Sequence, residues 1–489
     1  MRFDLTAAKG GLDSKLREEC GIAAIMGAPD AARQLYLLLF ALQHRGQEGA
    51  GMVVFPAPEQ GDNRQPRQHK DFGLVSEVFS RDVLERLAGE SGVGHVRYST
   101  TGGASKENIQ PFLFRTSLGP VAIAHNGNLT NADTLRNDLE NSGSVFQSTS
   151  DSEVFVHLIA RSSKATLKEK IIDAVASVTG AFSLVIKSGD RIFALRDSCG
   201  LRPLSLASIN GGYVVASETC AFDLIGASFI RDVEPGELVC LSESGIQSEF
   251  PWKPAARAFC AFEPIYFARP DSSFYGESIY MSRRRIGKIL ATECPADADI
   301  VVPIPDSGVA MAEGYAEASG IPFAMGLVRN HYVGRTFIQP GQDARDSSVR
   351  MKLNPVKSVL EGLRVVVVDD SLVRGTTAHR ILKLIKEAGA KEIHLRIGSP
   401  PITHSCFYGV DTPDREGLMA AQITVEEMRR NLEVRSLGFL SIPGLSKALD
   451  ERPGKTYCKA CFSGQYPVAV GRTITSQPTD AAGPGLFSE

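Results

Sequence analysis

Residues 365–377 read "VVVVDDSLVRGTT", an apolar run that ends in two adjacent carboxylates, followed by hydroxyls and a glycine. We interpret the valines as a buried parallel strand, which places Asp369 and Asp370 at its carboxyl end, where open α/β sheets bind ligands. Carboxylates can hold sugar hydroxyls or Mg²⁺, and the hydroxyls and N–H groups of the next loop can hold a phosphate. The segment therefore predicts a site for a phosphorylated sugar. The alternative, a solvated acidic turn with a helix cap, suits two adjacent aspartates but not the whole string.

A second reactive group is the thiol of Cys20, which stands directly before the apolar segment 21–27 and behind nineteen residues. A free thiol has a pKa of about 8.5 and needs activation before it can act as a nucleophile. An N-terminal α-amino group, with a pKa of roughly 7.7–8.0, can serve as the base. That chemistry requires removal of residues 1–19, which we therefore expect to be a propeptide. The alternative is a buried cysteine at the start of a strand.

Cys458 and Cys461 form a C-x-x-C pair, which suits a redox pair, half of a zinc site or half of an iron–sulfur site. Cys260 and Cys406 are the candidates to complete such a site. They lie far from this pair and from each other in the sequence, so spacing alone does not assemble the four thiols. Four cysteines suit Zn²⁺ as well as an iron–sulfur cluster, and the spacing leaves both open.

The bulk composition is that of an ordinary globular protein: 489 residues, 43% hydrophobic residues and a net charge of −3. This charge gives no support to a nucleic-acid surface. No apolar run approaches the roughly 20 residues of a membrane span, and the first residues lack the apolar core of a secretory signal. We therefore expect a cytoplasmic protein with no nucleic-acid or membrane partner, built from two or three domains.

The first half of the chain mixes short apolar runs, typical of strands, with stretches of helical periodicity. The runs are 21–27, 51–55, 121–125, 182–187 and 213–217, and the helical stretches are 30–46 and 151–163. This mixture predicts stacked sheets covered by helices. The polar residues 56–70 are expected to form an exposed loop.

The second half alternates apolar runs with helical stretches, which predicts a parallel sheet with crossover helices. The runs are 299–305, 364–370 and 392–399, and one clear amphipathic helix is expected over 378–388. We place the domain boundary near residues 250–262. Residues 471–489 are expected to form a disordered tail.

The string 365–377 resembles the phosphoribosylpyrophosphate (PRPP) loop of type I phosphoribosyltransferases. The resemblance implies that Asp369 and Asp370 engage the ribose hydroxyls and that the following loop contributes to PRPP binding. The loop residues concerned are Ser371, Arg374, Gly375, Thr376 and Thr377. Residues 301–308, "VVPIPDSG", resemble the second loop of that family, near the pyrophosphate and magnesium, so the implied Mg²⁺ ligands are Ser307, Asp369 and Asp370. Residues 329–350 resemble the loop that closes over PRPP and include Arg335 as an implied contact.

Four motifs that follow Cys20 in order resemble the glutaminase domain of N-terminal-nucleophile amidotransferases. They are "QHRGQEGAG" (43–51), "GHVRYSTTG" (94–102), "HNGNL" (125–129) and "TSDSEV" (149–154). The resemblance implies that Arg97 and Asp151 hold the α-carboxylate and α-amino group of glutamine. It also implies that Asn126 and Gly127 form an oxyanion hole beside the catalytic Cys20. The chemistry agrees, because Arg pairs with a carboxylate and amide donors stabilise the charge of an acyl-transfer transition state.

From Cys20 to about residue 470 the chain resembles the glutamine PRPP amidotransferases, including their iron–sulfur subgroup. This implies a [4Fe–4S] cluster on Cys260, Cys406, Cys458 and Cys461, with zinc as the alternative. The implied fold is of mixed α/β and α+β class. An N-terminal-nucleophile αββα sandwich over 20–255 is followed by a type I phosphoribosyltransferase domain with a parallel sheet over 256–470.

The same resemblance implies an enzyme that makes 5-phosphoribosylamine, glutamate and pyrophosphate from PRPP, glutamine and water, the first committed step of de novo purine biosynthesis. It also implies a homotetramer and purine nucleotide inhibitors. The chain departs from the family pattern at His331, where an arginine is usual, and at Ser198, where a proline is usual. The rival readings are an amidotransferase with another acceptor and a non-catalytic relative that senses PRPP or redox state.

Overall fold

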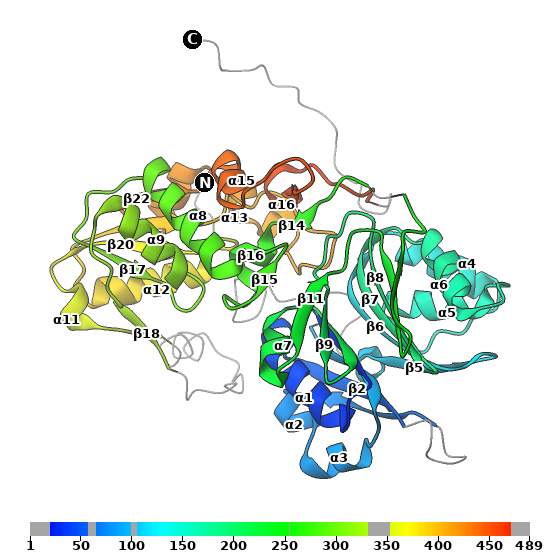
Figure 1. The fold of residues 1–489 in the computed structure, drawn as a ribbon. Helices are drawn as coiled ribbons and strands as arrows, with labels where there is room; N and C mark the ends of the chain where they lie inside the picture. The colour runs from blue at the N-terminus through cyan, green and yellow to red at the C-terminus, as the bar shows by residue number, and fades with distance from the viewer. Residues whose placement is uncertain (1–19, 57–64, 99–104, 254, 331–352, 471–489) are drawn as a thin grey trace.

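The structure is a computed structural model that describes residues 20–56, 65–98, 105–253, 255–330 and 353–470. The expected propeptide 1–19, the tail 471–489, Arg335 and His331 lie outside these residues. Two domains stand side by side, a sandwich of two sheets and a smaller sheet flanked by helices (Figure 1). This agrees with the fold class expected from the sequence.

The first domain stacks a seven-stranded and a six-stranded antiparallel sheet between two layers of helices. The first sheet has the order β11-β9-β10-β1-β4-β2-β3, with β1 (Gly21–Met26), β2 (Gly49–Phe55), β3 (Arg67–Phe72), β4 (Ser91–Arg97), β9 (Ser205–Ile209), β10 (Gly212–Ala216) and β11 (Ser228–Asp232). The second has the order β13-β12-β8-β7-β6-β5, with β5 (Phe112–Thr116), β6 (Gly119–Leu129), β7 (Gly180–Ser188), β8 (Arg191–Arg196), β12 (Leu238–Ser242) and β13 (Gly245–Glu249). The helices are α1 (Ala31–Ala41), α2 (Val75–Val78), α3 (Arg81–Arg86) and α7 (Cys220–Ile225) on the first sheet, and α4 (Ala132–Asn141), α5 (Glu153–Arg161) and α6 (Leu167–Ala176) on the second.

Strand β1 is apolar throughout because both of its faces are covered. Ala23 and Ile25 pack with the helix layer, whereas Ile22 and Ala24 pack in the core between the two sheets. Successive side chains of a strand point to opposite faces, so a strand buried on both sides needs a continuous apolar run. Cys20, directly before this strand, is thereby anchored to the centre of the first sheet.

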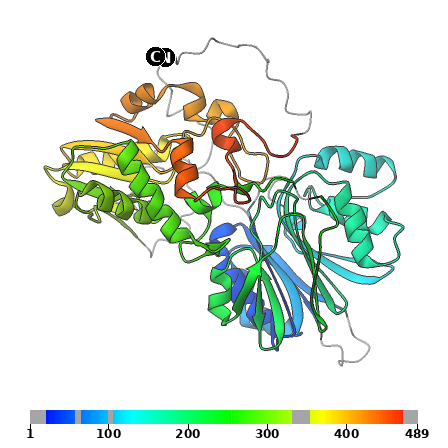
Figure 2. The same ribbon diagram turned by 45° about the horizontal axis from the view of Figure 1, so that its top comes forward.

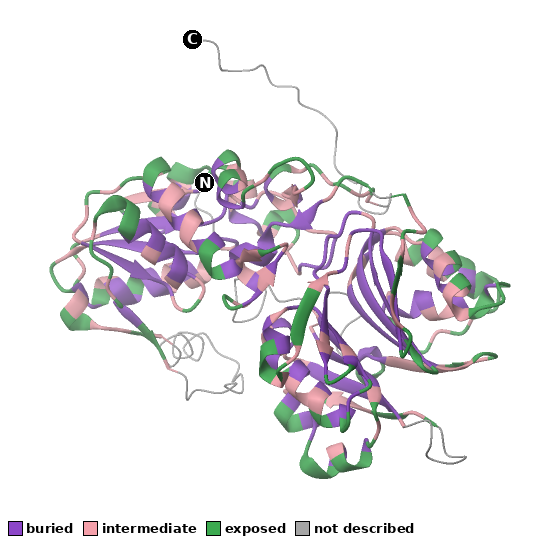
Figure 3. Ribbon diagram, viewed as in Figure 1, coloured by how far each residue is buried: buried purple, intermediate pink, exposed green. Residues whose placement is uncertain are grey.

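The second domain carries a parallel sheet of order β17-β20-β21-β22, as the alternating pattern predicted. Its strands are β17 (Ile300–Pro303), β20 (Arg364–Asp369), β21 (Glu392–Ile397) and β22 (Ser436–Phe439), and its main helices are α8 (Ile279–Glu293), α9 (Val309–Ser319), α12 (Thr376–Glu387), α14 (Val425–Asn431) and α15 (Ile442–Ala448). Val366 and Val368 pack on the core shared with α8 and α9, while Val365 and Val367 pack on the side of α12. Figure 3 shows these strands as the buried centre of the domain.

Short elements join the two domains. Strand β14 (Phe259–Cys260) pairs in parallel with β23 (Tyr457–Cys458), and β14 is followed by a π-helical turn, Glu263–Phe267. Helix α16 (Ala460–Ser463) follows β23 and lies at the junction of the domains (Figure 2). The remaining short elements are β15 (Ser273–Phe274), β16 (Glu277–Ser278), β18 (Leu327–Arg329), β19 (Leu353–Pro355), α11 (Lys357–Leu360) and α13 (Met419–Gln422).

The prediction of an exposed loop over residues 56–70 is wrong at its C-terminal end, because residues 67–70 belong to β3. This strand is polar and half-exposed because it lies at the edge of its sheet and pairs only with β2. An edge strand does not need apolar residues on both faces, so the polar composition of residues 67–70 did not indicate a strand.

Among the helices that the structure describes, none is both long enough and apolar enough to span a bilayer.

Candidate functional site

Cys20 lies at the end of a strand pair that also carries Arg97. Gly21 pairs with Val96, so the next position along each strand brings Cys20 beside Arg97. The Cys20 thiol donates a hydrogen bond to the carbonyl of Tyr98, with Sγ 3.5 Å from the oxygen. The Cys20 carbonyl accepts a hydrogen bond from Arg45 Nε at 3.3 Å. The sheet and one buried arginine therefore fix the position of the thiol.

Burial raises the pKa of the Cys20 thiol to about 11. The positive charge of Arg97 opposes this rise in pKa and the negative charge of Asp151 adds to it, so both charges act on the thiol. A thiol with this pKa is almost entirely protonated at neutral pH and is a weak nucleophile. The thiol needs a base beside it before it can attack an amide.

Asn126 and Gly127 lie in β6, where they pair with Ser183 and Phe182 of β7. Asn126 is buried, and its side-chain nitrogen Nδ2 has no hydrogen-bond partner within the described part of the chain. Gly127 has φ +148°, and a Cβ there would lie 2.0 Å from the carbonyl oxygen of Ala181. A buried donor without a partner costs about 1–3 kcal/mol. This cost is removed when a ligand oxygen accepts its hydrogen bond.

Asp151 stands just before α5 and faces the end of β6. Its Oδ2 accepts a hydrogen bond from the backbone N–H of Leu129 at 2.9 Å, and its Oδ1 accepts one from Ser152 Oγ at 3.2 Å. His125 Nδ1 lies 3.8 Å from the same carboxylate, and burial lowers the pKa of His125, so the ring is neutral near pH 7. Asp151 is thereby held against the strand that carries Asn126 and Gly127.

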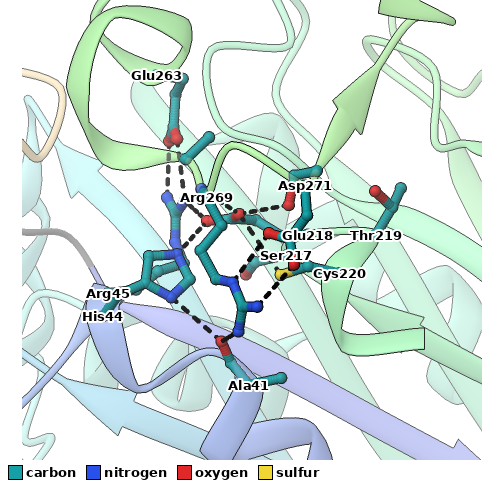
Figure 4. Close-up of polar contacts among 12 residues, drawn as sticks. Ala41, His44, Arg45, Ser217, Glu218, Thr219, Cys220, Glu263, Arg269 and Asp271 are labelled. Carbon is teal, nitrogen blue, oxygen red and sulfur yellow. Dashed lines mark hydrogen bonds and ion pairs between the residues drawn. The ribbon is translucent and has the colours of Figure 1, made fainter. Parts of the chain in front are cut away.

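A buried ion network joins the first domain to the domain junction (Figure 4). Arg45 donates to Glu218 Oε1 at 2.6 Å and to Glu263 Oε1 at 2.6 Å, and all three side chains are buried. His44 Nε2 lies 2.7 Å from Glu218 Oε1. Burial opposes ionisation of Glu218, but the charges of His44 and Arg45 outweigh it and hold the pKa of this carboxyl well below its usual range. The network therefore connects Arg45, which bonds to the Cys20 carbonyl, to Glu263 in the turn that follows Cys260.

Asp369 and Asp370 are buried at the carboxyl end of β20. Asp370 Oδ2 accepts a hydrogen bond from Ser371 Oγ at 2.6 Å, and Asp370 Oδ1 accepts one from Ser307 Oγ. Because Pro303 of β17 pairs with Val368 of β20, the loops after the two strands meet at the same edge of the sheet. The structure thus brings Ser307 and the paired acids together, although they are far apart in the sequence.

The same edge carries the start of α12. Gly375 is its N-cap residue with φ 77°, a left-handed conformation that favours glycine. Arg374, Thr376 and Thr377 are half-buried around it. Nearby, Arg329 donates to Asp306 Oδ2 at 2.6 Å in the loop that carries Ser307. Backbone N–H groups at a helix start, together with hydroxyls and cations, suit a phosphate.

The four candidate cysteine ligands line one narrow pocket at the domain junction. Strand pairing sets Cys260 opposite Cys458, and the Cys461 carbonyl accepts hydrogen bonds from the backbone of Thr403 and His404, at 3.0 and 3.1 Å, in the segment that leads to Cys406. Within the described ranges, no three His, Cys, Asp or Glu side chains gather closely enough to hold a metal ion. The four thiols nevertheless share one cavity, which is the arrangement that a multi-atom cluster with four thiolate ligands needs.

The segment that carries Cys406 also contacts the first domain. Asn128 Nδ2 donates to the carbonyl of Phe407 at 3.0 Å, and Arg202 Nε donates to the carbonyl of Tyr408 at 2.8 Å. Arg202 is fully buried and also lies 3.6 Å from Glu263. The cysteine pocket is therefore built directly against the strand of Asn126 and Gly127.

The sequence reading missed Arg45, Glu218, Glu263 and Arg202 as parts of the site. Each is a single charged residue without a periodic signal. Glu263 could have been suspected, because it is a charge inside the apolar run "FCAFEPIYF", residues 259–267. A carboxylate there is either exposed or paired, and the structure shows it paired.

Two family models match the chain in the order of its domains. Residues 95–223 match a glutamine amidotransferase domain, and residues 278–397 match a phosphoribosyl transferase domain. The first range contains Arg97, Asn126, Gly127 and Asp151, and the second contains Ser307 and the 369–377 loop. The geometric division into two sites therefore coincides with two independent sequence matches.

Known relatives resemble the chain over nearly its whole length. It is 50% identical over 457 residues to amidophosphoribosyltransferase 1, chloroplastic, of Arabidopsis thaliana, covering 93% of this chain and 80% of that protein. It is 47% identical to the amidophosphoribosyltransferase of Bacillus subtilis, covering 93% and 95% of the two chains. The solved structure of the B. subtilis glutamine PRPP amidotransferase, complexed with ADP and GMP, superposes with a TM-score of 0.87 at 46% identity and covers 93% of this chain and 98% of that one. At this identity and coverage, the protein belongs to the amidophosphoribosyltransferase family.

Proposed function

We propose that the chain hydrolyses glutamine at Cys20 and uses the released ammonia at the 369–377 loop to make 5-phosphoribosylamine from PRPP. The observation that carries this proposal is the direct contact between the two halves. Asn128, next to the candidate oxyanion hole, bonds to the 406–409 segment of the second domain. A reactive intermediate passed between two sites needs a junction that excludes water, and contact between the domains is the first requirement for one.

In the first half-reaction, the Cys20 sulfur attacks the side-chain amide carbon of glutamine. Arg97 pairs with the substrate α-carboxylate and Asp151 with its α-ammonium group. The buried amide nitrogen of Asn126 and the backbone N–H of Gly127 donate to the carbonyl oxygen as it gains negative charge. The C–N bond breaks, ammonia leaves with the proton from the thiol, and water then cleaves the thioester to free glutamate.

In the second half-reaction, the ammonia nitrogen attacks C1 of PRPP while the bond from C1 to the pyrophosphate oxygen breaks, and the nitrogen loses one proton to solvent. Asp369 and Asp370 hold the ribose hydroxyls. Ser371, Arg374, Gly375, Thr376 and Thr377 bind the 5′-phosphate end. Mg²⁺ usually binds through one or two carboxylates and substrate phosphates. The oxygen atoms of Ser307, Asp369 and Asp370 fit that requirement, and the ion would neutralise charge on the leaving pyrophosphate.

The base for Cys20 would be its own α-amino group. The raised pKa of the thiol supports this proposal, because no attack proceeds without deprotonation. The α-amino group becomes free only when residues 1–19 have been removed. The proposal therefore includes a propeptide of these nineteen residues, a glutaminase domain over 20–255 and a phosphoribosyltransferase domain over 256–470.

The cysteine pocket would hold a [4Fe–4S] cluster through Cys260, Cys406, Cys458 and Cys461. The shared cavity and the pairing of Cys260 with Cys458 support it. The cytoplasmic location expected from the sequence belongs to the same proposal, as do the homotetramer and the purine nucleotide inhibitors implied by the family resemblance. The ADP and GMP in the similar B. subtilis structure support the nucleotides.

The first test replaces the nucleophile. The Cys20→Ala variant is expected to lose glutamine-dependent synthesis of 5-phosphoribosylamine and to retain synthesis from ammonia, because only the first site needs the thiol. Cys240→Ala, a buried cysteine of the same domain, is the matched control and should retain both activities. Loss of both activities in folded Cys20→Ala protein would contradict the division into two sites.

A second test addresses the cluster without using activity. Protein purified without oxygen should contain four iron and four sulfide per chain, as a [4Fe–4S] cluster requires. The Cys461→Ser variant should lose iron and its visible absorbance, whereas Cys294→Ser should keep them. One zinc per chain and no iron would instead support the zinc alternative.

A further inference from the structure

We propose that Gln110 is a positioning residue for glutamine hydrolysis, because its side-chain amide ties the oxyanion strand β6 to the carboxylate of Asp151. Gln110 is buried and lies in the turn before β5. It lies outside the motifs through which the sequence resembles a glutaminase. The inference rests on the roles proposed above for Asn126, Gly127 and Asp151.

The strand register explains why a side chain is needed here. Strands β5 and β6 pair with Phe112 opposite Ile123, and continuing this register would set Gln110 opposite His125. Strand β5 begins only at Phe112, so its backbone does not reach that far. Gln110 Oε1 instead accepts a hydrogen bond from the backbone N–H of His125 at 2.8 Å. The side-chain oxygen of Gln110 thus takes the place of the backbone carbonyl that a longer β5 would offer to His125, directly before Asn126.

The other end of the same amide reaches the start of α5. Gln110 Nε2 donates to Ser152 Oγ at 3.1 Å. Ser152 Oγ donates to Asp151 Oδ1 at 3.2 Å and lies 2.8 Å from His125 Nδ1. The set is complete when His125 carries its ring proton on Nδ1, since Ser152 Oγ then accepts two hydrogen bonds and donates one. Gln110 and Ser152 therefore add a second connection between Asp151 and β6, beside the direct hydrogen bond from the Leu129 backbone to Asp151.

This link matters because the two joined groups hold opposite ends of one substrate. Asp151 would bind the α-ammonium group, whereas Asn126 and Gly127 would receive the side-chain carbonyl oxygen. A displacement of one relative to the other moves the reacting carbon away from Cys20, and small misplacements cost catalysis steeply. Loss of the link is therefore expected to raise the KM for glutamine and to lower kcat.

The experiment compares Gln110→Leu with wild type in the full-length, processed enzyme. Leucine fills a similar volume but makes neither hydrogen bond. We expect kcat/KM for glutamine to fall about ten- to a hundredfold, with changes in both kcat and KM. Synthesis from ammonia should be unchanged. Gln65→Leu, which removes an exposed amide of the same domain bonded to Arg115, should behave as wild type in both assays.

A double-mutant cycle separates positioning from general stability. If Gln110 acts through Ser152, Gln110→Leu combined with Ser152→Ala should be no worse than the more damaging single variant, because both changes break one link. A lowered Tm with unchanged kcat and KM in Gln110→Leu would overturn the inference. Parallel loss of the ammonia-dependent activity, or additive losses in the cycle, would overturn it as well.

The outcome is distinguishable from failure of the proposed function. If wild-type enzyme, freed of residues 1–19, hydrolysed no glutamine, the proposed function would fail before Gln110 was tested. If wild type and Gln110→Leu hydrolysed glutamine equally well, the function would stand and the positioning role would fall.

Discussion

The side-chain nitrogen of Asn126 lies inside the sandwich without a hydrogen-bond partner among the described residues. Folding has already removed this donor from water, at a free-energy cost that the folded enzyme alone does not recover. The cost is offset only when an oxygen occupies the site, and a negatively charged oxygen is the better acceptor. The residue is therefore suited to bind the transition state more tightly than the substrate.

Replacement of this amide should affect the rate more than substrate binding. Asn126→Ala is expected to lower kcat for glutamine about 10²–10³-fold, the range for loss of one oxyanion donor, with little change in KM. Steady-state kinetics with glutamine and with ammonia would measure both effects. Asn131→Ala, whose amide bonds to the 177–179 turn instead, should keep wild-type kcat. A rise in KM for glutamine at constant kcat would show that Asn126 binds the ground state instead.

Single residues also mark the limit of sequence reasoning. Cys20, Arg97, Asn126 and Asp151 could be named as candidates from the sequence because each sits in a recognisable string, and their roles stay predictions. Gln110 was not, because its two partners lie 15 and 42 positions away and follow from a register that exists only in the folded sheet.

At the scale of elements, α12 shows how a loop conformation and a helix start combine. The periodic apolar face predicted the helix over 378–388, and the structure begins it at Thr376 because Gly375 adopts a left-handed N-cap. The strands with continuous apolar runs were also predicted, because a strand that is buried on both faces needs apolar residues at every position. The short pair β14 and β23 was not predicted, because a two-residue strand has no period.

The N-cap glycine gives a prediction with a matched control. Gly375→Ala forces a side chain into a left-handed backbone, at a cost of about 1–2 kcal/mol, and should displace the N–H groups that face the phosphate. We expect the KM for PRPP to rise about tenfold with ammonia as donor. Gly362→Ala carries the same strain at φ 76°, with open space around it. It should lower Tm and leave the KM for PRPP unchanged; equal KM effects in the two variants would contradict the loop assignment.

At the scale of the whole molecule, the network of Arg45, Glu218 and Glu263 is a buried electrostatic connection between the domains. Its carboxylates are fully desolvated, so each depends on its partners for its charge. Removing one member of a buried pair typically costs about 3–5 kcal/mol, because the remaining charge stays buried without compensation. The domain junction is therefore sensitive to any change that neutralises Glu218.

Acid is one such change, and the sign of its effect follows from the lowered pKa of Glu218. A carboxyl with a lower pKa in the folded than in the unfolded state stabilises the fold above its unfolded pKa, about 4.3 for Glu. That stabilisation is lost as the pH falls toward the folded pKa. The difference in Tm between wild type and Glu218→Gln should shrink as the pH falls below about 4.3.

Thermal unfolding across this pH range would measure the difference. Glu85→Gln, which breaks an exposed pair with Arg81, should show almost no difference in Tm from wild type at any pH. A Glu218→Gln difference that grew as the pH fell below about 4.3 would contradict the assigned direction of the pKa shift.

The pairing of β14 with β23 also constrains the order of events during protein synthesis. A ribosome releases Phe259 and Cys260 long before Tyr457 and Cys458, and domains near the start of a chain generally fold first. During this interval the nascent chain carries Cys260, and later Cys406, without Cys458 and Cys461 of the pocket. The proposed four-cysteine site can therefore be completed only after translation has delivered Cys461.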